Sequence, residues 1–293
     1  MIRLADENML PRLRRMWQTC FDESKEYTEF VFSNLLHSSQ MLVHTGEDGR
    51  PAAMLNWKLL RFTTPRATVT GAYIFGVATL PEYRRRGLSR TLMSKLHTIL
   101  QERGVSLACL IPAEVSLFNL YRGQGFETVF FYRRLNVAAN DIPKSSGGVL
   151  SVAKLEEMEK TRNAFFAGSS LFGAWDKRHL RYTGLECRFY SGEALRFSGR
   201  GGTGYAVCYP KKDGGILVKE LCAAHNDLPA LLAALHTRFG AAAYDLRLPA
   251  DFPPYPGDST VETLPLAMVK WYDNNKRPAG EIGGAPWFAF GLD

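Results

Sequence analysis

The sequence predicts an α/β (α+β) protein of two tandem mixed-sheet domains, of which the second is a degenerate copy of the first. Two observations predict this architecture. Short strands and amphipathic helices alternate along the first half of the chain. The second half then repeats their order. A chain of 293 residues is long enough for two domains. We place the domains at residues 1–137 and 149–273.

The first domain is organised around residues 72–100. Residues 72–80 are rich in aromatic and β-branched side chains, which predicts a strand that Pro81 ends. A long helix begins near Gly87. Its apolar face is formed by Leu88, Leu92, Met93, Leu96, Ile99 and Leu100. The strand and the helix are joined by the turn Arg84-Arg85-Arg86-Gly87.

The other elements of the first domain follow from periodicity and turn residues. Further strands are expected at residues 1–5, 40–44, 52–62, 106–111 and 126–137. Further helices are expected at residues 7–21, 26–36 and 112–122. The resulting order, β-α-α-β-β-β-α-β-α-β, predicts a mixed sheet with helices on its faces.

A linker is expected at residues 138–148, where the composition is AANDIPKSSGG. Beyond it we expect strands at residues 149–152, 193–197, 205–209, 216–222 and 264–272. Helices are expected at 154–166, at 175–190 and from Leu228 onward. Residues 274–293 form a C-terminal tail whose last aromatic residues favour docking, and its extended length of at most ~66 Å would let it reach the first domain.

The two halves share a specific pattern. Both long helices contain Leu-His-Thr, beginning at Leu96 and Leu235, and each is followed by a glycine, a strand and Pro-Ala-acid. The second copy lacks five positions in the turn before its helix and has no arginine or glycine there. We therefore expect one active domain and one structural copy, with a chance similarity of two α/β domains as the alternative.

Composition and charge argue against several functions. The net charge is +7, but no basic run exceeds three residues and no basic stripe is interleaved with aromatics, which disfavours nucleic-acid binding. No apolar run of ~20 residues predicts a membrane span, and the N-terminus does not resemble a signal peptide. Five scattered cysteines and six histidines without metal-ligand spacing predict reduced thiols in the cytoplasm and no metal site.

The turn before the long helix has the chemistry of an anion site. Gly87 allows a ligand to approach the backbone closely. The first N–H groups of a helix lack internal partners and lie at the positive end of its dipole. Together with three arginines they suit a pyrophosphate. A solvated basic turn is the alternative interpretation.

The first half resembles the GCN5-related N-acetyltransferase (GNAT) superfamily over roughly residues 1–137. The resemblance rests on a strand, Arg84-x-x-Gly87-x-Ser89, a long helix, a strand, and a helix bearing Tyr121 before Gly125-Phe126. The family motif is [Gln/Arg]-x-x-Gly-x-[Gly/Ala], so Ser89 departs from it. The tandem arrangement is similar to the enhanced-intracellular-survival type, whose sterol-carrier-like third domain we expect this chain to lack because of its length.

The resemblance implies acetyl-CoA as co-substrate. Its pyrophosphate would lie on the backbone N–H groups of residues 85–90, and its pantetheine arm would pair with the strand ending at Thr79. Gly76 would interrupt that strand as a bulge, a packing glycine being the alternative. The expected cofactor-binding residues are Val77, Ala78, Thr79, Arg84, Arg85, Arg86, Gly87, Leu88, Ser89 and Arg90.

The resemblance also implies direct attack of an amine on the thioester, which requires an acid and a base. Tyr121 is the expected acid, with a core tyrosine as the alternative. For the base, the tandem family implies the C-terminal carboxylate, here Asp293. A water relay and Glu114 are alternatives, although an acid in the first turn after Pro112 also complements the helix dipole.

The acceptor is expected between the first two helices, the later strands and the tail. Candidate residues there are Trp17, Phe21, Asp22, Glu26 and Phe30, an acidic and aromatic set that suits a cationic amine. Core packing explains Trp17 and Phe30 equally well. The sequence thus predicts an acetyl-CoA-dependent N-acetyltransferase acting on a primary amine of a small molecule or peptide. The alternative is a catalytically silent acyl-CoA-binding regulatory protein, and a homo-oligomer is left open.

Overall fold

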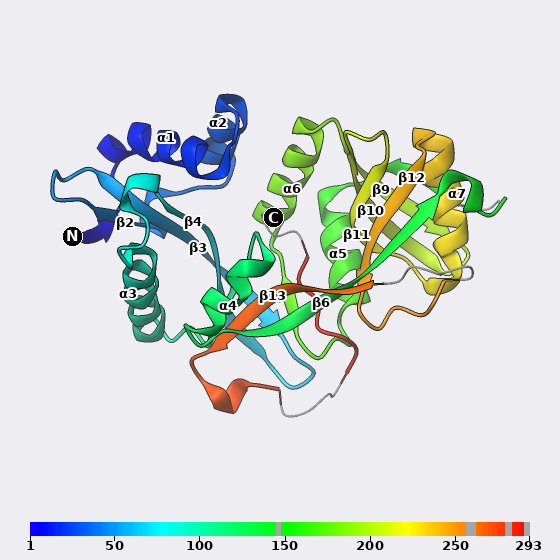
Figure 1. The fold of residues 1–293 in the computed structure, drawn as a ribbon. Helices are drawn as coiled ribbons and strands as arrows, with labels where there is room; N and C mark the ends of the chain where they lie inside the picture. Colours follow the sequence, from blue (N-terminus) through cyan, green and yellow to red (C-terminus); the bar gives the residue numbers. More distant parts are fainter. Residues whose placement is uncertain (145–147, 256–261, 279–282, 290–293) are drawn as a thin grey trace.

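The computed structural model describes residues 1–144, 148–255, 262–278 and 283–289, and it contains one mixed sheet of 13 strands (Figure 1). The strands are β1 (Ile2–Leu4), β2 (Met41–Thr45), β3 (Pro51–Thr63), β4 (Thr68–Thr79), β5 (Leu107–Leu110), β6 (Glu127–Ala138), β7 (Val149–Val152), β8 (Phe172–Ala174), β9 (Glu193–Gly199), β10 (Gly202–Pro210), β11 (Ile216–Cys222), β12 (Ala243–Pro249) and β13 (Glu262–Trp271). The α-helices are α1 (Leu10–Phe21), α2 (Lys25–Asn34), α3 (Leu88–Glu102), α4 (Val115–Arg122), α5 (Leu155–Phe165), α6 (Lys177–Phe189) and α7 (Leu228–Phe239).

The sheet runs through both halves of the chain. Its strand order is β1-β2-β3-β4-β5-β13-β6-β12-β11-β10-β9-β7, and β8 pairs with β3. The pairs β4–β5 and β11–β12 are parallel. Each parallel pair is connected by a long helix, α3 in the first half and α7 in the second. The structural repeat is therefore a β-α-β unit in each half, as the sequence pattern indicates.

One strand lies in a different place from the one its sequence position suggests. β13, expected with the second half, lies between β5 and β6: Met268 pairs with Leu110, and Glu262 with Arg134. β6 in turn continues beyond the first half and pairs with β12, up to Ala138 beside Ala243. The insertion covers an edge of β5 that would otherwise present unpaired backbone groups. The division at 137 and 149 remains a prediction, whereas β13 completes the sheet of the first half.

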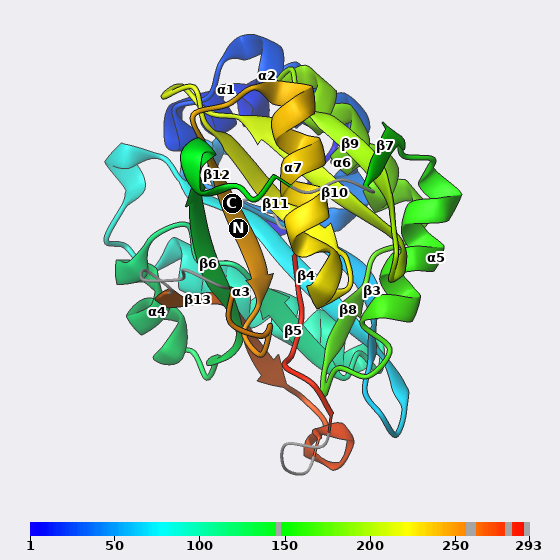
Figure 2. The same cartoon turned by 90° about the vertical axis from the view of Figure 1, so that its right-hand side faces the viewer.

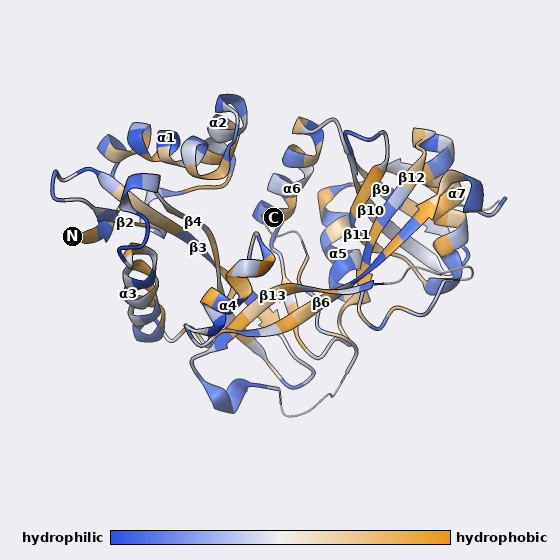
Figure 3. Ribbon diagram, in the orientation of Figure 1, coloured by the Kyte–Doolittle hydropathy of each residue, from blue (hydrophilic) through white to orange (hydrophobic). Residues whose placement is uncertain are grey.

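The helices cover the sheet with their apolar sides. α3 packs Leu92, Leu96 and Leu100 against the first-half strands, and all three are fully buried. α7 does the same in the second half, and the strands between them are the most hydrophobic part of the ribbon (Figure 3). A third cluster spans the two halves and includes Trp17, Tyr73, Trp175, Tyr205 and Phe288. The halves therefore share a core instead of meeting at a polar interface.

The C-terminal tail takes part in this shared core. Trp287 forms a β-bridge with Phe172 of β8, alongside which the tail runs (Figure 2). The Phe288 ring lies 5.7 Å from that of Phe62 and 5.0 Å from that of Trp175, centroid to centroid. The described part of the tail thus contacts both the first-half sheet, which the sequence analysis expected it to be able to reach, and the second half.

A buried ion pair between Arg162 and Glu220 holds the tail through a hydrogen bond to Trp287. Arg162 donates to both carboxylate oxygens of Glu220, at 2.9 and 3.2 Å, and both side chains are fully buried. Glu220 also accepts hydrogen bonds from the Tyr205 hydroxyl and, at 2.8 Å, from Trp287 Nε1. The carboxylate thereby connects α5, β10 and the tail.

Two simpler observations concern the whole described part of the chain. All five cysteines are free, and four of them are buried. None of the helices there combines the length and apolar character needed to span a bilayer.

A buried lysine lies at the junction of the halves. Lys58 on β3 is 4% exposed, and no group in the described part of the chain accepts a hydrogen bond from its ammonium. The pKa of Lys58 is lowered to about 8. Burial is the main cause, repulsion from Arg178 acts in the same direction, and attraction to Asp176 opposes both. A buried amine without a hydrogen-bond partner destabilises the folded state.

We therefore expect Lys58→Met to stabilise the protein at pH 7 by roughly 1–3 kcal/mol. The pH dependence provides a sharper test. Because the folded pKa lies below the unfolded one, the unfolded chain binds more protons between about pH 8 and pH 10.5, so the stability of the parent protein rises with pH in that window. Lys58→Met should remove that rise, measured by urea unfolding at pH 7 and pH 9.5. An equal rise in stability in the parent protein and the variant would show that Lys58 is not the group responsible.

Candidate active site

The site begins where two parallel strands separate. β4 pairs with β5 only from Gly71 beside Leu107 to Ile74 beside Leu110, although β4 continues to Thr79. No strand of the described ranges therefore pairs with the last residues of β4 on that side. The gap leaves backbone groups of β4 available to a ligand that adopts an extended conformation.

β4 has a bulge before its end. This confirms the expectation that Gly76 interrupts the strand as a bulge. The register with β3 shifts between Met54 and Asn56, opposite Gly76 and Val77. Gly76 has a φ of +57°, and a Cβ there would lie 2.6 Å from Trp17 and 2.8 Å from the Asn56 amide nitrogen. Both the backbone conformation and the close approach of the indole require glycine.

The turn that follows forms a concave array of backbone N–H groups. Arg85 and Gly87 have φ values of +62° and +74°, and α3 begins directly after Gly87. No acceptor in the described chain bonds the N–H groups of Leu88, Ser89 and Arg90, the first turn of α3. Positive φ values beside a helix N-terminus are typical of an anion-binding backbone nest. The left-handed conformation of Arg85 is uncommon for a non-glycine residue.

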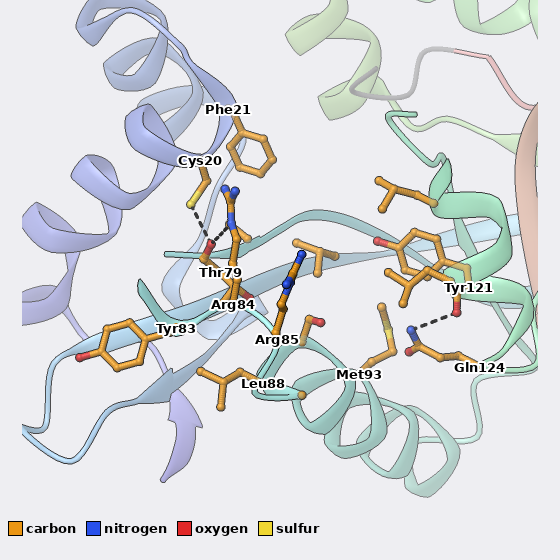
Figure 4. Close-up of a pocket in the computed structure, with 16 residues that line it drawn as sticks. Cys20, Phe21, Thr79, Tyr83, Arg84, Arg85, Leu88, Met93, Tyr121 and Gln124 are labelled. Atoms are coloured by element: carbon orange, nitrogen blue, oxygen red, sulfur yellow. Dashed lines mark hydrogen bonds between the residues drawn. The ribbon is translucent and has the colours of Figure 1, made fainter. Parts of the chain in front are cut away.

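The three arginines of the turn differ in their orientation. The side chains of Arg84 and Arg85 extend into the cavity above the turn (Figure 4). Arg84 Nε donates to the Thr79 carbonyl at 3.3 Å. Arg86 turns away, donating to the Glu82 carbonyl at 3.0 Å and lying over the Tyr83 ring.

A first cavity of about 300 Å³ lies between this turn, the end of β4, α1 and α4 (Figure 4). Most of the residues expected to hold the cofactor line it: Val77, Ala78, Thr79, Arg84, Arg85, Gly87, Leu88 and Ser89. Arg86 and Arg90 do not line it, although the N–H of Arg90 belongs to the free first turn of α3. Met93 and Gln124 also line the cavity and had no predicted role there.

Tyr121 lies at the far end of this cavity from the turn. It belongs to α4, is 8% exposed and packs edge-on against Phe126. Its hydroxyl points toward the cavity (Figure 4). Burial raises the pKa of Tyr121 to about 12. The phenol is therefore protonated at neutral pH and able to donate a proton.

A second cavity, of about 260 Å³, adjoins the first and shares Phe21, Val77, Leu117 and Tyr121 with it. Of the residues expected to contact the acceptor, Trp17 and Phe21 line it. Asp22 and Glu26 are exposed and do not line it. Phe30 lies at the junction of α2 and α6, 5.5 Å from the ring of Tyr182 and 5.1 Å from that of Phe189.

The acidic groups of the second cavity are different from those expected. Glu23 and Glu186 line it, together with Tyr27. Burial raises the pKa of Glu23, and repulsion from Glu186 and Asp22 raises it further. Glu23 and Tyr27 lie within the segment that the sequence indicated. Glu186 comes from α6, and no local sequence signal placed it beside the first half.

Glu114, one of the expected bases, lines neither cavity. It precedes α4, is exposed, and accepts a hydrogen bond from the Ser116 hydroxyl at 3.2 Å. Asp293 lies outside the described residues. Within the described ranges, no group of three or more His, Cys, Asp or Glu residues has the geometry of a metal site.

The second half has a different arrangement at the matching turn. Asp227 directly precedes α7, is 5% exposed, and accepts a hydrogen bond from the Gly201 N–H at 2.9 Å. A carboxylate therefore lies beside the helix terminus where the first half leaves free N–H groups. A fixed negative charge at this position disfavours binding of a second anion.

The first half of the chain matches a protein-family model. Residues 1–129 match the model of a family described as acetyltransferase (GNAT) domain, which confirms the resemblance expected for roughly residues 1–137. No curated protein matches the chain.

Several solved structures share the fold over most of the chain. A GCN5-related N-acetyltransferase from Kribbella flavida has a TM-score of 0.71 and 19% identity, over 93% of this chain and 71% of that one. One from Anabaena variabilis has a TM-score of 0.74 and 14% identity, over 92% and 72%. Eis1 from Mycobacterium abscessus has a TM-score of 0.64 and 16% identity, over 92% and 73%. These similarities confirm the predicted α/β fold class.

Proposed function

We propose that the protein transfers an acetyl group from acetyl-CoA to a primary amine of a small molecule or peptide, and the match of residues 1–129 to an acetyltransferase (GNAT) domain model supports this proposal. The observation that carries the proposal is the pair of adjoining cavities that share Tyr121. One has the anion-binding turn for a nucleotide cofactor, and the other has carboxylates and aromatic rings for an amine. Both substrates would therefore meet at the same phenol.

The first cavity supplies the groups that acetyl-CoA requires. The N–H groups of Leu88, Ser89 and Arg90 would bind its pyrophosphate, with Arg84 and Arg85 adding positive charge. The free side of β4 from Val77 to Thr79 would bind its pantetheine amides in the manner of an added strand. Ser89, the departure from the family motif, keeps its N–H available because the contact uses backbone atoms.

Two protons must move during the reaction. The amine attacks the thioester carbonyl carbon, the C–S bond breaks, and the sulfur takes a proton from the Tyr121 hydroxyl. The attacking amine loses one proton, which returns to solvent through a base. We propose the C-terminal carboxylate of Asp293 for this step, with a water relay as the alternative.

Deleting Leu292 and Asp293 tests the base. We expect turnover to fall by about 10²-fold, since general-base catalysis contributes 10²–10⁴-fold, while acetyl-CoA binding is retained. Initial rates of thiol release and calorimetric acetyl-CoA affinity measure the two quantities. Full activity in the shortened chain would exclude Asp293 and leave the water relay.

Thiol release from acetyl-CoA over a panel of amines tests the proposed function itself. The panel includes simple monoamines, polyamines, aminoglycosides and peptide N-termini. We expect amine-dependent release of one thiol per acetylated product. Tight acetyl-CoA binding without release for any amine would instead identify a regulatory acyl-CoA-binding protein.

The second half is proposed to be a structural copy without a cofactor of its own. Asp227 beside α7 supports this proposal because it places a negative charge where the first half would bind phosphate. The free cysteines favour a reducing compartment, so we propose that the reaction takes place in the cytoplasm.

A further inference from the structure

The second cavity contains a carboxylate held by three phenols. Glu186 Oε1 accepts hydrogen bonds from the hydroxyls of Tyr27 at 2.8 Å and Tyr182 at 3.0 Å. Glu186 Oε2 accepts one from Tyr209 at 3.1 Å. The residue is 6% exposed and lines the cavity. Three phenol donors from α2, α6 and β10 therefore converge on one carboxylate.

This buried carboxylate has no cationic partner among the residues that the structure describes. No lysine, arginine or histidine in the described ranges forms an ion pair with Glu186, whose hydrogen-bond partners there are the three tyrosines. Buried ionised groups are normally paired. Glu220, which is also buried, differs from Glu186 in that it is paired with Arg162. A cation supplied from outside would complete the Glu186 site.

The walls of the cavity suit a cation of moderate size. Glu23 adds a second carboxylate, and the rings of Trp17, Phe21, Tyr27 and Phe75 surround the space. Aromatic faces attract ammonium groups. Trp17 is 5% exposed, and its indole N–H has no acceptor in the described chain. That N–H leaves a donor available for a polar atom of the ligand.

The cation at Glu186 cannot be the amine that reacts. Only a neutral amine has the lone pair that attacks the thioester, and a nearby carboxylate favours the protonated form. An ammonium held as an ion pair keeps its proton, whereas the amine that reacts must give up its proton to the base proposed above. Glu186 is instead suited to an ammonium that stays protonated throughout the reaction.

We propose that Glu186, contributed by the second half of the chain, selects acceptors that carry a second amino group in addition to the one that is acetylated. This inference rests on the proposed acetyl transfer and names its substrate class, a diamine or longer polyamine. It also gives the second half a direct part in recognition. Tyr182 and Tyr209 are positioning residues that hold the carboxylate.

The experiment compares 1,4-diaminobutane with 1-aminobutane, which have equal chain lengths and differ in one amino group. We expect the parent protein to favour the diamine in kcat/KM by about 10- to 100-fold, the range of one charge-assisted hydrogen bond. In Glu186→Gln the kcat/KM values for the two amines should differ by no more than a few-fold, mainly because KM for the diamine rises. The readout is the ratio of the two kcat/KM values, so a change common to both amines cancels.

Glu156→Gln is the matched control, since Glu156 is an exposed residue of α5 and the substitution removes the same charge. It should leave the preference intact. Tyr209→Phe, which removes one donor to the carboxylate without lining the cavity, should weaken the preference partly. Thermal melting establishes that each variant is folded.

Three outcomes would overturn the inference. Equal kcat/KM for the two amines in the parent protein would do so, as would a Glu186→Gln variant that keeps the preference. A folded variant that loses the same factor with both amines would assign Glu186 a merely structural role. In each case thiol release persists, so the proposed function stands. Absence of release with every amine would overturn the proposed function, and the inference with it.

Discussion

Tyr121→Phe is expected to lower turnover by about 10²- to 10⁴-fold, the contribution of a general acid, while acetyl-CoA affinity stays nearly unchanged. The departing thiolate would then have to leave without a proton donor. Phenylalanine preserves the ring that packs against Phe126, so the fold should be unaffected. Thiol-release kinetics and calorimetric acetyl-CoA binding measure the two effects separately.

The pH profile provides the control for this assignment. Because burial raises the pKa of Tyr121 to about 12, the phenol remains protonated across the range in which the enzyme can be assayed. Its ionisation should therefore cause no loss of kcat below about pH 10. A variant that retains full turnover, or a parent protein whose kcat falls with a pKa near 8 that Tyr121→Phe removes, would contradict the role as acid.

Glu220→Gln is expected to lower the free energy of unfolding by about 3–5 kcal/mol, because it removes the carboxylate charge that pairs with the fully buried Arg162. The amide also changes the hydrogen bonds to Tyr205 and Trp287, so the tail should dock less firmly. Urea unfolding followed by circular dichroism measures the stability. If the single variant does not fold, Arg162→Met combined with Glu220→Leu should restore folding, since the charge and its partner are removed together.

An exposed ion pair of the same chain is the matched control. Arg277 Nη2 and Glu127 Oε2 lie 2.6 Å apart, with side chains 47% and 56% exposed. Glu127→Gln should cost less than about 1 kcal/mol, because solvent screens exposed pairs. A comparable loss for Glu127→Gln and Glu220→Gln would contradict the argument from burial.

The elements of the first half could be predicted from the sequence because their causes are local. The strand ending at Thr79, the bulge at Gly76 and the helix after Gly87 depend on short-range sterics and apolar periodicity. The same is true of the turn from Arg84 to Gly87. Eight of the ten residues expected to bind the cofactor, in β4, this turn and α3, line the first cavity.

The lining of the second cavity could be predicted from the sequence only in part, for a physical reason. Periodicity shows which face of a helix is buried but not which distant segment covers it. Of the residues expected in the α1–α2 region, Asp22 and Glu26 lie outside the second cavity, while their neighbours Glu23 and Tyr27 line it. Neighbouring residues of a short loop point in different directions, so a shift of one position changes the assignment.

The sequence by itself determined the local conformations: the anion-binding turn, the helix behind it, and the loss of that turn in the second half. Only the tertiary structure decided which segments meet. It placed β13 between β5 and β6, the Trp287 indole against Glu220, and Glu186 beside Tyr27, 159 residues away in the chain. Local conformation is set by interactions among neighbouring residues, whereas contacts between distant segments are chosen by the packing of the whole core, which no single stretch encodes.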